Sequence, residues 1–140
     1  MTKVYTDDYT LLNAGKKGYP GFQGQDMISI QQKYEAAALA SGSTIYMFLP
    51  PVGAIWTGKG KLFYDDLGAS TITLAVGIVG NTTKFSGATD AQTAAGETVL
   101  AGGVDGLGYV FDGATPVIIT TAGSQAATGT IGLQMDFQLQ

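Results

Sequence analysis

The chain has 140 residues, a formal net charge of -4, and only 13 % charged residues, about half the usual share for a globular protein. It has no histidine or cysteine, which excludes ordinary zinc sites, cysteine nucleophiles and Ser-His-Asp triads. All seven basic residues are lysine, so no arginine is present to bind phosphate through two hydrogen bonds. The acidic balance also argues against a nucleic-acid partner, because the phosphate backbone requires clustered positive charge.

Residues 1–25 are predicted to form an extended arm. Glycines and a proline interrupt its second half, and neither a helical nor a strand period runs through it. Its apolar residues are too numerous for a solvated linker, so we expect them to lie on another surface. That surface is either a neighbouring protein or the chain's own domain. The predicted interface residues are Val4, Tyr5, Tyr9, Leu11, Leu12, Tyr19 and Phe22.

No membrane or secretory segment is expected. The first residues lack the basic start and apolar run of a secretory signal, and no stretch approaches 18 uninterrupted apolar residues. We therefore expect a protein made in the cytoplasm of its host cell, without a membrane partner.

From Met27 the pattern changes to short strands that end at turn residues. A strand is predicted over 27–33, one or two helical turns over 34–42, and a nearly continuous apolar strand over 43–49 that ends before two prolines. Two further strands are predicted over 54–57 and 61–65. The aromatic residues of this region are expected to pack in the core by default, although some could line a subunit or sugar-binding surface; they are Tyr46, Phe48, Trp56, Phe63 and Tyr64.

The segment GAIWTGKG, residues 53–60, nearly matches a phosphate-binding loop. The match fails because Gly60 replaces the required serine or threonine, and because the chain continues as an aromatic-rich strand instead of a helix. Glycine turns between strands are the preferred interpretation, and no nucleotide cofactor is expected.

The second half of the chain contains the clearest strand patterns. Residues 70–79 and 130–140 alternate apolar and polar side chains with a period of two, and the second run does so without an error. A polar loop is predicted over 80–97, with a single helical turn at 89–95. Shorter strands are predicted over 97–102, 108–113 and 115–123, with a flexible or bulged glycine-rich connection over 102–108.

These elements together predict an all-β protein. About eight antiparallel strands in one domain, residues 26–140, indicate a β-sandwich or jelly-roll-like fold behind the extended N-terminal arm. Strand spacing alone leaves a closed barrel open as an alternative.

Acidic residues are the main candidates for chemistry in this chain. Adjacent acids in an extended segment point to opposite faces, so neither Asp7-Asp8 nor Asp65-Asp66 makes a catalytic pair by itself. No acidic spacing matches a calcium loop, and Asp105 and Asp112 stand alone. We therefore expect no catalytic residues, no metal and no cofactor.

Several stretches together resemble small virion proteins of tailed bacteriophages, of the head decoration, cement or head-fibre-base type. They are STIYMFL before a Pro-Pro turn, DDLGASTITLAVGIVGNTTKF, TDAQTAAGETVL and VIITTAGSQAATGTIGL, within residues 40–137. The resemblance implies a sandwich or jelly-roll module on the capsid surface, associated with the major capsid protein or other virion proteins. It also implies a homo-oligomer, with a trimer favoured, and it assigns no individual residue a role.

The leading hypothesis is accordingly a structural protein that binds, and stabilises or decorates, the outside of a phage head. The alternative is a carbohydrate-binding adhesion module that uses Trp56 and nearby tyrosines as stacking platforms. An enzyme is the least favoured interpretation, because no spacing organises the available acids, hydroxyls and lysines.

Overall fold

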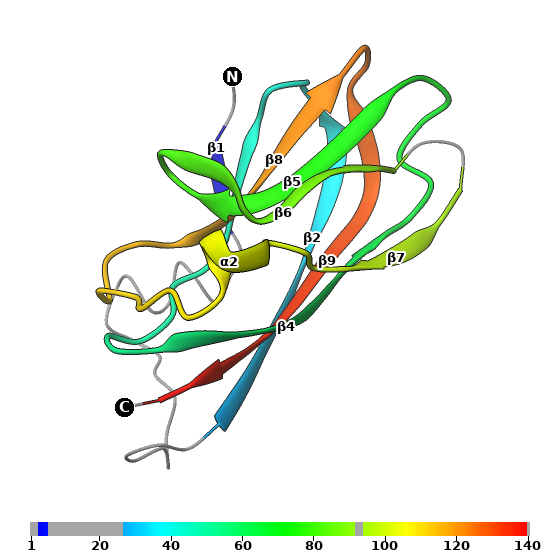
Figure 1. Ribbon diagram of the computed structural model, residues 1–140. Coiled ribbons are helices and arrows are strands. Elements are labelled where there is room, and N and C mark those ends of the chain that lie inside the picture. The colour runs from blue at the N-terminus through cyan, green and yellow to red at the C-terminus, as the bar shows by residue number, and fades with distance from the viewer. Residues whose placement is uncertain (1–2, 6–26, 92–93, 140) are drawn as a thin grey trace.

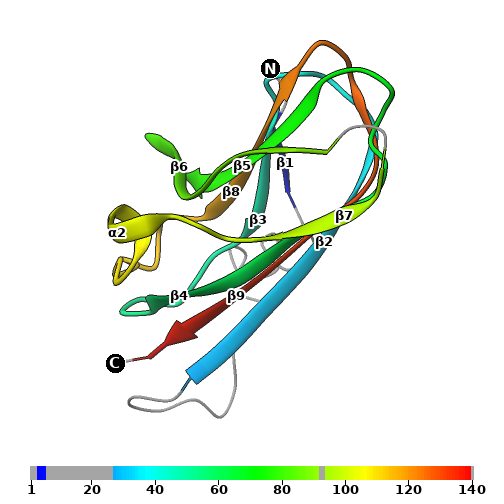
Figure 2. The same cartoon turned by 45° about the vertical axis from the view of Figure 1, so that its right-hand side comes forward.

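The computed structural model describes residues 3–5, 27–91 and 94–139. Within these ranges nine strands form two sheets that pack face to face (Figure 1). The five-stranded sheet has the order β1 (Lys3–Tyr5), β3 (Thr44–Phe48), β8 (Val117–Gly123), β5 (Ile72–Ile78) and β6 (Asn81–Asp90). The four-stranded sheet has the order β2 (Met27–Leu39), β9 (Ala127–Gln138), β4 (Ile55–Tyr64) and β7 (Gly96–Val99). Figure 2 shows the two layers from the side. The predicted all-β sandwich is confirmed.

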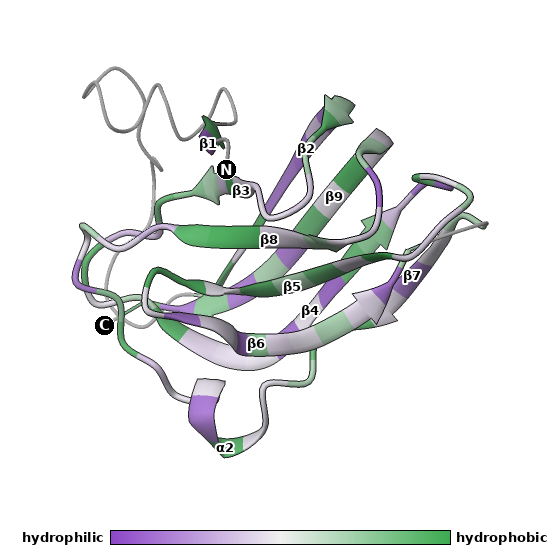
Figure 3. Ribbon diagram, turned by 90° about the horizontal axis from the view of Figure 1, so that it is seen from above, coloured by the Kyte–Doolittle hydropathy of each residue, from purple (hydrophilic) through white to green (hydrophobic). Residues whose placement is uncertain are grey.

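The strands with a clean period of two bury one face between the sheets. On β9, Ile131, Leu133, Met135 and Phe137 are all buried, and Figure 3 shows this alternation as bands along the strand. β8 does not show this alternation, because its first three residues, which point to both faces of the sheet, are all buried. The core is therefore a single apolar layer between the sheets, to which β9, β5 and β4 contribute alternate residues and β6 contributes Phe85 alone.

Two predicted elements of the first half are wrong in detail. The helical turns expected over 34–42 do not form, because β2 continues to Leu39 and stays paired with β9 past Ala36. Alanine favours helices, but the ladder to β9 outweighs that preference. The strands expected over 54–57 and 61–65 are one strand, β4, with a register shift between Trp56 and Gly60.

The second half also contains corrections. The polar loop expected over 80–97 is wrong, because β6 occupies Asn81–Asp90 and pairs with β5. The helical turn expected at 89–95 begins inside β6, and residues 92–93 lie outside the described ranges. The glycine-rich connection over 102–108 contains a one-turn helix, α2 (Gly103–Gly106). Finally, the strand expected over 108–113 is reduced to a single bridge between Val110 and Ile55.

One pairing departs from the antiparallel rule. β1 lies beside β3 in parallel, with Val4 opposite Ile45. A parallel pair needs a long crossover connection, and here the connection from β1 to β3 covers residues 6–43 and includes β2 of the other sheet.

The packing of the core predicts how much stability is lost when a buried ring is removed. Replacing Phe137 with alanine removes a fully buried ring that contacts Phe48 and Phe111, and should lower the free energy of unfolding by about 3–5 kcal/mol. Urea denaturation followed by tryptophan fluorescence measures this change. Phe63→Ala is the matched control, because its ring is 39 % exposed and its loss should cost far less. Equal losses in the two variants would contradict the assignment of Phe137 to the core.

Candidate interaction surfaces

The two ends of the sandwich differ in polarity. At one end lie the loops over 49–54, 79–80 and 100–116, and they expose five large apolar side chains: Val52, Val79, Val104, Leu107 and Val110. We call these five residues the apolar end. The loops at the opposite end expose no large apolar side chain within the described residues. Several exposed large apolar side chains on one side of a domain are typical of an interaction site.

α2 holds the centre of the apolar end in place. The Asn81 side-chain amide donates to Asp105 Oδ2 at 2.8 Å, and Lys84 Nζ lies 3.5 Å from Asp105 Oδ1. The helix also sits closely on the sheet, because a Cβ at Gly106 would overlap the Lys84 carbonyl and the Trp56 ring. The side chains of Val104 and Leu107, which flank this contact, are 93 % and 57 % exposed.

The segment after α2, residues 107–113, is held in place by backbone hydrogen bonds and by an aromatic cluster. Phe111 exchanges two hydrogen bonds of 2.8 Å with the 53–54 backbone, and the Tyr109 carbonyl accepts from Trp56 N at 3.1 Å. Below, the Phe111 ring lies 5.8 Å from that of Phe85 and 5.5 Å from that of Phe137. Although this segment forms no regular strand, its shape is therefore set by the core.

Asp112 closes the last turn of this segment. Its Oδ1 accepts from the backbone N–H groups of Ala114 and Thr115, both at 2.9 Å. The bond from the Ala114 amide, together with those from Thr115, lowers the pKa of Asp112 from its ordinary value. A lowered pKa means that the ionised carboxylate stabilises the turn above the ordinary aspartate pKa. This stabilisation is lost as pH falls through the lowered value.

β1 covers the edge of the five-stranded sheet. Val4 is half-buried and packs against the core, and Tyr5 stands opposite Tyr46 in the ladder. The other predicted interface residues lie outside the described residues, and these are Tyr9, Leu11, Leu12, Tyr19 and Phe22.

The segment 6–26 is attached at the apolar end on both sides. β1 is parallel to β3, and β3 runs toward the 49–54 loop, so the chain leaves Tyr5 in that direction. Met27 stands opposite Gln138, which in turn pairs with Ile55 at the start of β4, just after the same loop. Both junctions of the segment 6–26, which makes up most of the predicted arm 1–25, therefore lie on the side of the exposed apolar residues.

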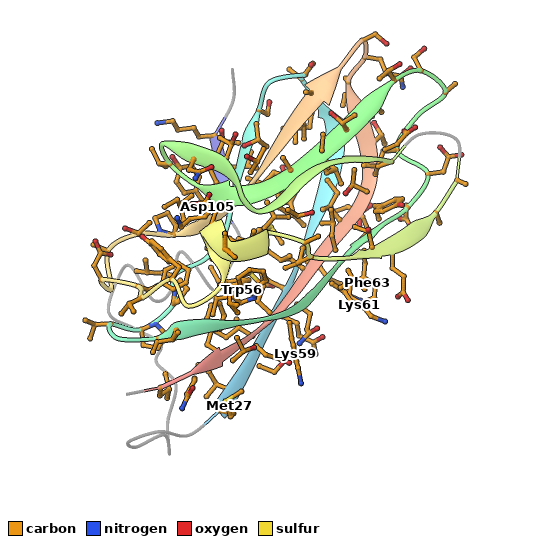
Figure 4. All side chains as sticks on the ribbon, in the orientation of Figure 1. Met27, Trp56, Lys59, Lys61, Phe63 and Asp105 are labelled. Carbon is orange, nitrogen blue, oxygen red and sulfur yellow. The ribbon has the colours of Figure 1, made fainter. Side chains whose placement is uncertain are left out.

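The aromatic residues singled out in the sequence divide between core and surface. Trp56 is 1 % exposed, and its indole N–H donates to the Lys59 carbonyl at 3.0 Å between the sheets (Figure 4). It cannot be a sugar-stacking platform, so that part of the carbohydrate hypothesis is wrong. Phe63 instead extends from the outer face of β4, on the same side as Lys59 and Lys61.

The acidic residues considered as candidates for chemistry accept hydrogen bonds from the backbone and have structural roles. Asp65 Oδ2 accepts from the Thr130 backbone at 3.0 Å, and Asp66 Oδ1 accepts from Gly68 N at 3.2 Å. Across the described ranges, no three acidic side chains come together as a metal site would require. The GAIWTGKG segment lies in and before β4, where no helix follows to hold a phosphate. No helix in the described part of the chain is long and apolar enough to span a membrane.

Comparison with solved structures finds similar folds among phage capsids. The chain superimposes with a TM-score of 0.76 on a chain of the capsid of Ralstonia phage GP4, at 21 % identity and covering 99 % of both chains. For the capsid asymmetric unit of cyanophage Pam1 the TM-score is 0.68, at 24 % identity over 89 % of this chain and 93 % of the other. For the acid-stable capsid of Helicobacter pylori bacteriophage KHP30 it is 0.58, at 17 % identity over 83 % and 94 %. At these identities the likeness establishes a shared fold. No protein-family model and no curated protein sequence matches the chain.

The apolar end was not predicted as a site from the sequence. Its only signal is a set of apolar residues placed in or beside turns, such as Val52 after two prolines and Val104 between glycines. Residues of this kind are individually ordinary on a surface, and only the fold gathers them at one end.

The turn at Asp112 gives a testable prediction. In Asp112→Ala the amides of Ala114 and Thr115 lose their acceptor, so their hydrogen exchange at pH 7 should accelerate by about tenfold or more. NMR-detected exchange measures this directly. Asp66→Ala, which breaks a comparable turn at the opposite end, is the control and should leave both amides protected. In the unaltered protein, the shifts of both amides should titrate only below the ordinary aspartate range. Unchanged exchange in Asp112→Ala would refute the turn's dependence on this carboxylate.

Proposed function

We propose that this chain is a structural virion protein that binds the outer surface of a phage capsid and stabilises or decorates it. The observation that carries the proposal is the apolar end, which concentrates five exposed large apolar side chains on one side of the sandwich. Docking on a subunit surface would remove them from water, with a gain of about 25 cal/mol for each Å² of apolar area covered. The near full-length likeness to chains in phage capsid structures supports a shell as the partner.

The composition of the chain agrees with this role. Only 13 % of the residues are charged, and large apolar side chains remain exposed after the core has formed. A surface of this kind favours stable association, which suits a protein that remains on a particle after attachment.

The arm is proposed to strengthen attachment. Both junctions of residues 6–26 lie on the side of the apolar end, so this part of the arm is connected to the domain near the surface that would meet the shell. Its apolar residues would order on neighbouring subunits as a segment that folds upon binding. A homo-oligomer, with a trimer favoured, would place several arms around one site and increase the apparent affinity.

The docking surface is tested by charge substitution. In the double variant Val104→Asp and Leu107→Asp, two exposed apolar side chains become carboxylates that docking would desolvate, so capsid affinity should fall by about tenfold or more. Co-sedimentation with shells of the major capsid protein from the same genome measures this. Val99→Asp is the matched control, because Val99 is 62 % exposed but lies in the β7 ladder opposite Lys61 and is not one of the five residues of the apolar end. Undiminished binding of the double variant would overturn this docking mode.

The arm is tested without disturbing β1. The double variant Leu11→Asp and Leu12→Asp should weaken shell binding by about tenfold while leaving the melting temperature unchanged, since these residues are proposed to contact only the capsid. The alternative is that the arm packs on its own domain. A lowered melting temperature with unchanged capsid binding would establish that alternative.

A further inference from the structure

The outer face of the four-stranded sheet contains an open groove of about 740 Å³, within the range of roughly 300–1,000 Å³ that is typical of ligand sites. The groove crosses β2, β9 and β4 and continues to the start of β7. It lies toward the end of the sandwich opposite to the apolar end, since Tyr64, Ala95 and Thr130 belong to it. The residues that define it here are Gln31, Lys33, Phe63, Asp65, Gly132 and Gln134.

Gly132 forms the floor of this groove. It lies in β9 and pairs with Lys33 on one side and Phe63 on the other. A Cβ at this position would meet Phe63 Cβ at 3.5 Å and Lys33 Cγ at 3.8 Å, which are ordinary contacts, and the backbone does not have a positive φ. The fold therefore does not require glycine here. A glycine inside a strand reduces stability, and it is typical of places where a ligand or another backbone approaches closely.

The walls of the groove combine one exposed aromatic ring with hydrogen-bond donors and hydrogen-bond acceptors. Phe63 is 39 % exposed and projects from the outer face of β4 (Figure 4). Among the described residues, the side chains of Gln31 and Lys33 have no hydrogen-bond or ion-pair partner, so their donors are available.

Acceptors are available on the other side of Gly132. Asp65 uses Oδ2 to accept from Thr130, which leaves Oδ1. The Gln134 amide nitrogen donates to Ser29 and Asp136, which leaves its carbonyl oxygen. The groove thus offers free donors and free acceptors around a single exposed ring.

We propose that this groove binds a neutral saccharide that stacks on Phe63 above Gly132. A pyranose ring has an apolar C–H face for the phenyl ring and a rim of hydroxyls that both donate and accept. An apolar peptide would leave the surrounding amides and charges unpaired, which is costly. A charged ligand is not favoured, because Lys33 and Asp65 are the only charged residues of the lining within the described ranges, and their charges cancel. The proposal depends on the groove alone and not on capsid docking.

The test uses a substitution that fills the groove without harming the fold. Gly132→Val adds a β-branched side chain where a Cβ would make only ordinary van der Waals contacts and the strand is continuous, so the melting temperature should stay the same or rise. Full-length protein is screened on an array of neutral oligosaccharides built from glucose, galactose, mannose and N-acetylglucosamine, and the strongest hit is titrated by calorimetry. Gly132→Val and Phe63→Ala should each weaken binding of that oligosaccharide by about tenfold or more.

Gly87→Val is the matched control. Gly87 lies in β6 of the other sheet, and a Cβ there would meet nothing within 4 Å, so this variant should bind the oligosaccharide like the unaltered protein. The proposal is overturned if no oligosaccharide binds above background, or if Gly132→Val binds as well as Gly87→Val. Capsid co-sedimentation of the same variants separates this inference from the docking proposal. Loss of capsid binding in Gly132→Val without any saccharide hit would assign the groove to a protein contact instead.

Discussion

The contact on which the rest of the structure depends is the aromatic cluster between the sheets. Phe111 contacts Phe137 of the four-stranded sheet and Phe85 of the five-stranded sheet, and Phe85 contacts Trp56 of β4 with ring centroids 5.1 Å apart. These rings come from segments far apart in the sequence, and each pair adds about 0.5–1.5 kcal/mol beyond its buried area. Because Phe111 itself lies outside any regular strand, the cluster fixes both the stacking of the sheets and the path of the 107–113 segment. The apolar end is therefore built on the core and is preorganised for contact.

Much of the fold could be predicted because several strands bury only one face. In β9 and β5 a shift of one residue would expose every apolar side chain, so the alternation of residues such as Leu133 and Leu74 determines both the strand and its orientation. The missed elements lack this signal. β6 is an edge strand with exposed threonines and glycine, and it reads as a polar loop. The end of β2 contains three alanines in a row, Ala36 to Ala38, before Leu39, and its strand state depends on pairing with β9.

The candidate sites were less predictable for a different physical reason. An exposed valine carries no signal by itself, and Val52 and Val104 become a surface only when the loops of three strand connections meet at one end. The aromatic residues near 56 and 63 show the same limit. Trp56 and Phe63 lie seven residues apart in one strand, so its period of two places Trp56 in the core while Phe63 faces outward. The two short strands predicted over 54–57 and 61–65 did not carry this relation. Composition alone could not distinguish them.

The arrangement of the two surfaces follows from the way the strands are connected. The apolar end is made from loops, whose shape is held from below by the aromatic cluster and from the side by the Asn81–Asp105 bond. The groove is made from the middle of three strands, where the backbone is rigid and Gly132 opens space between Lys33 and Phe63. Contact at the apolar end would leave the groove uncovered, because the groove lies on a lateral face toward the opposite end. A protein anchored by its loops could thus present a strand-built site to solvent, and neither surface would require the other to change shape.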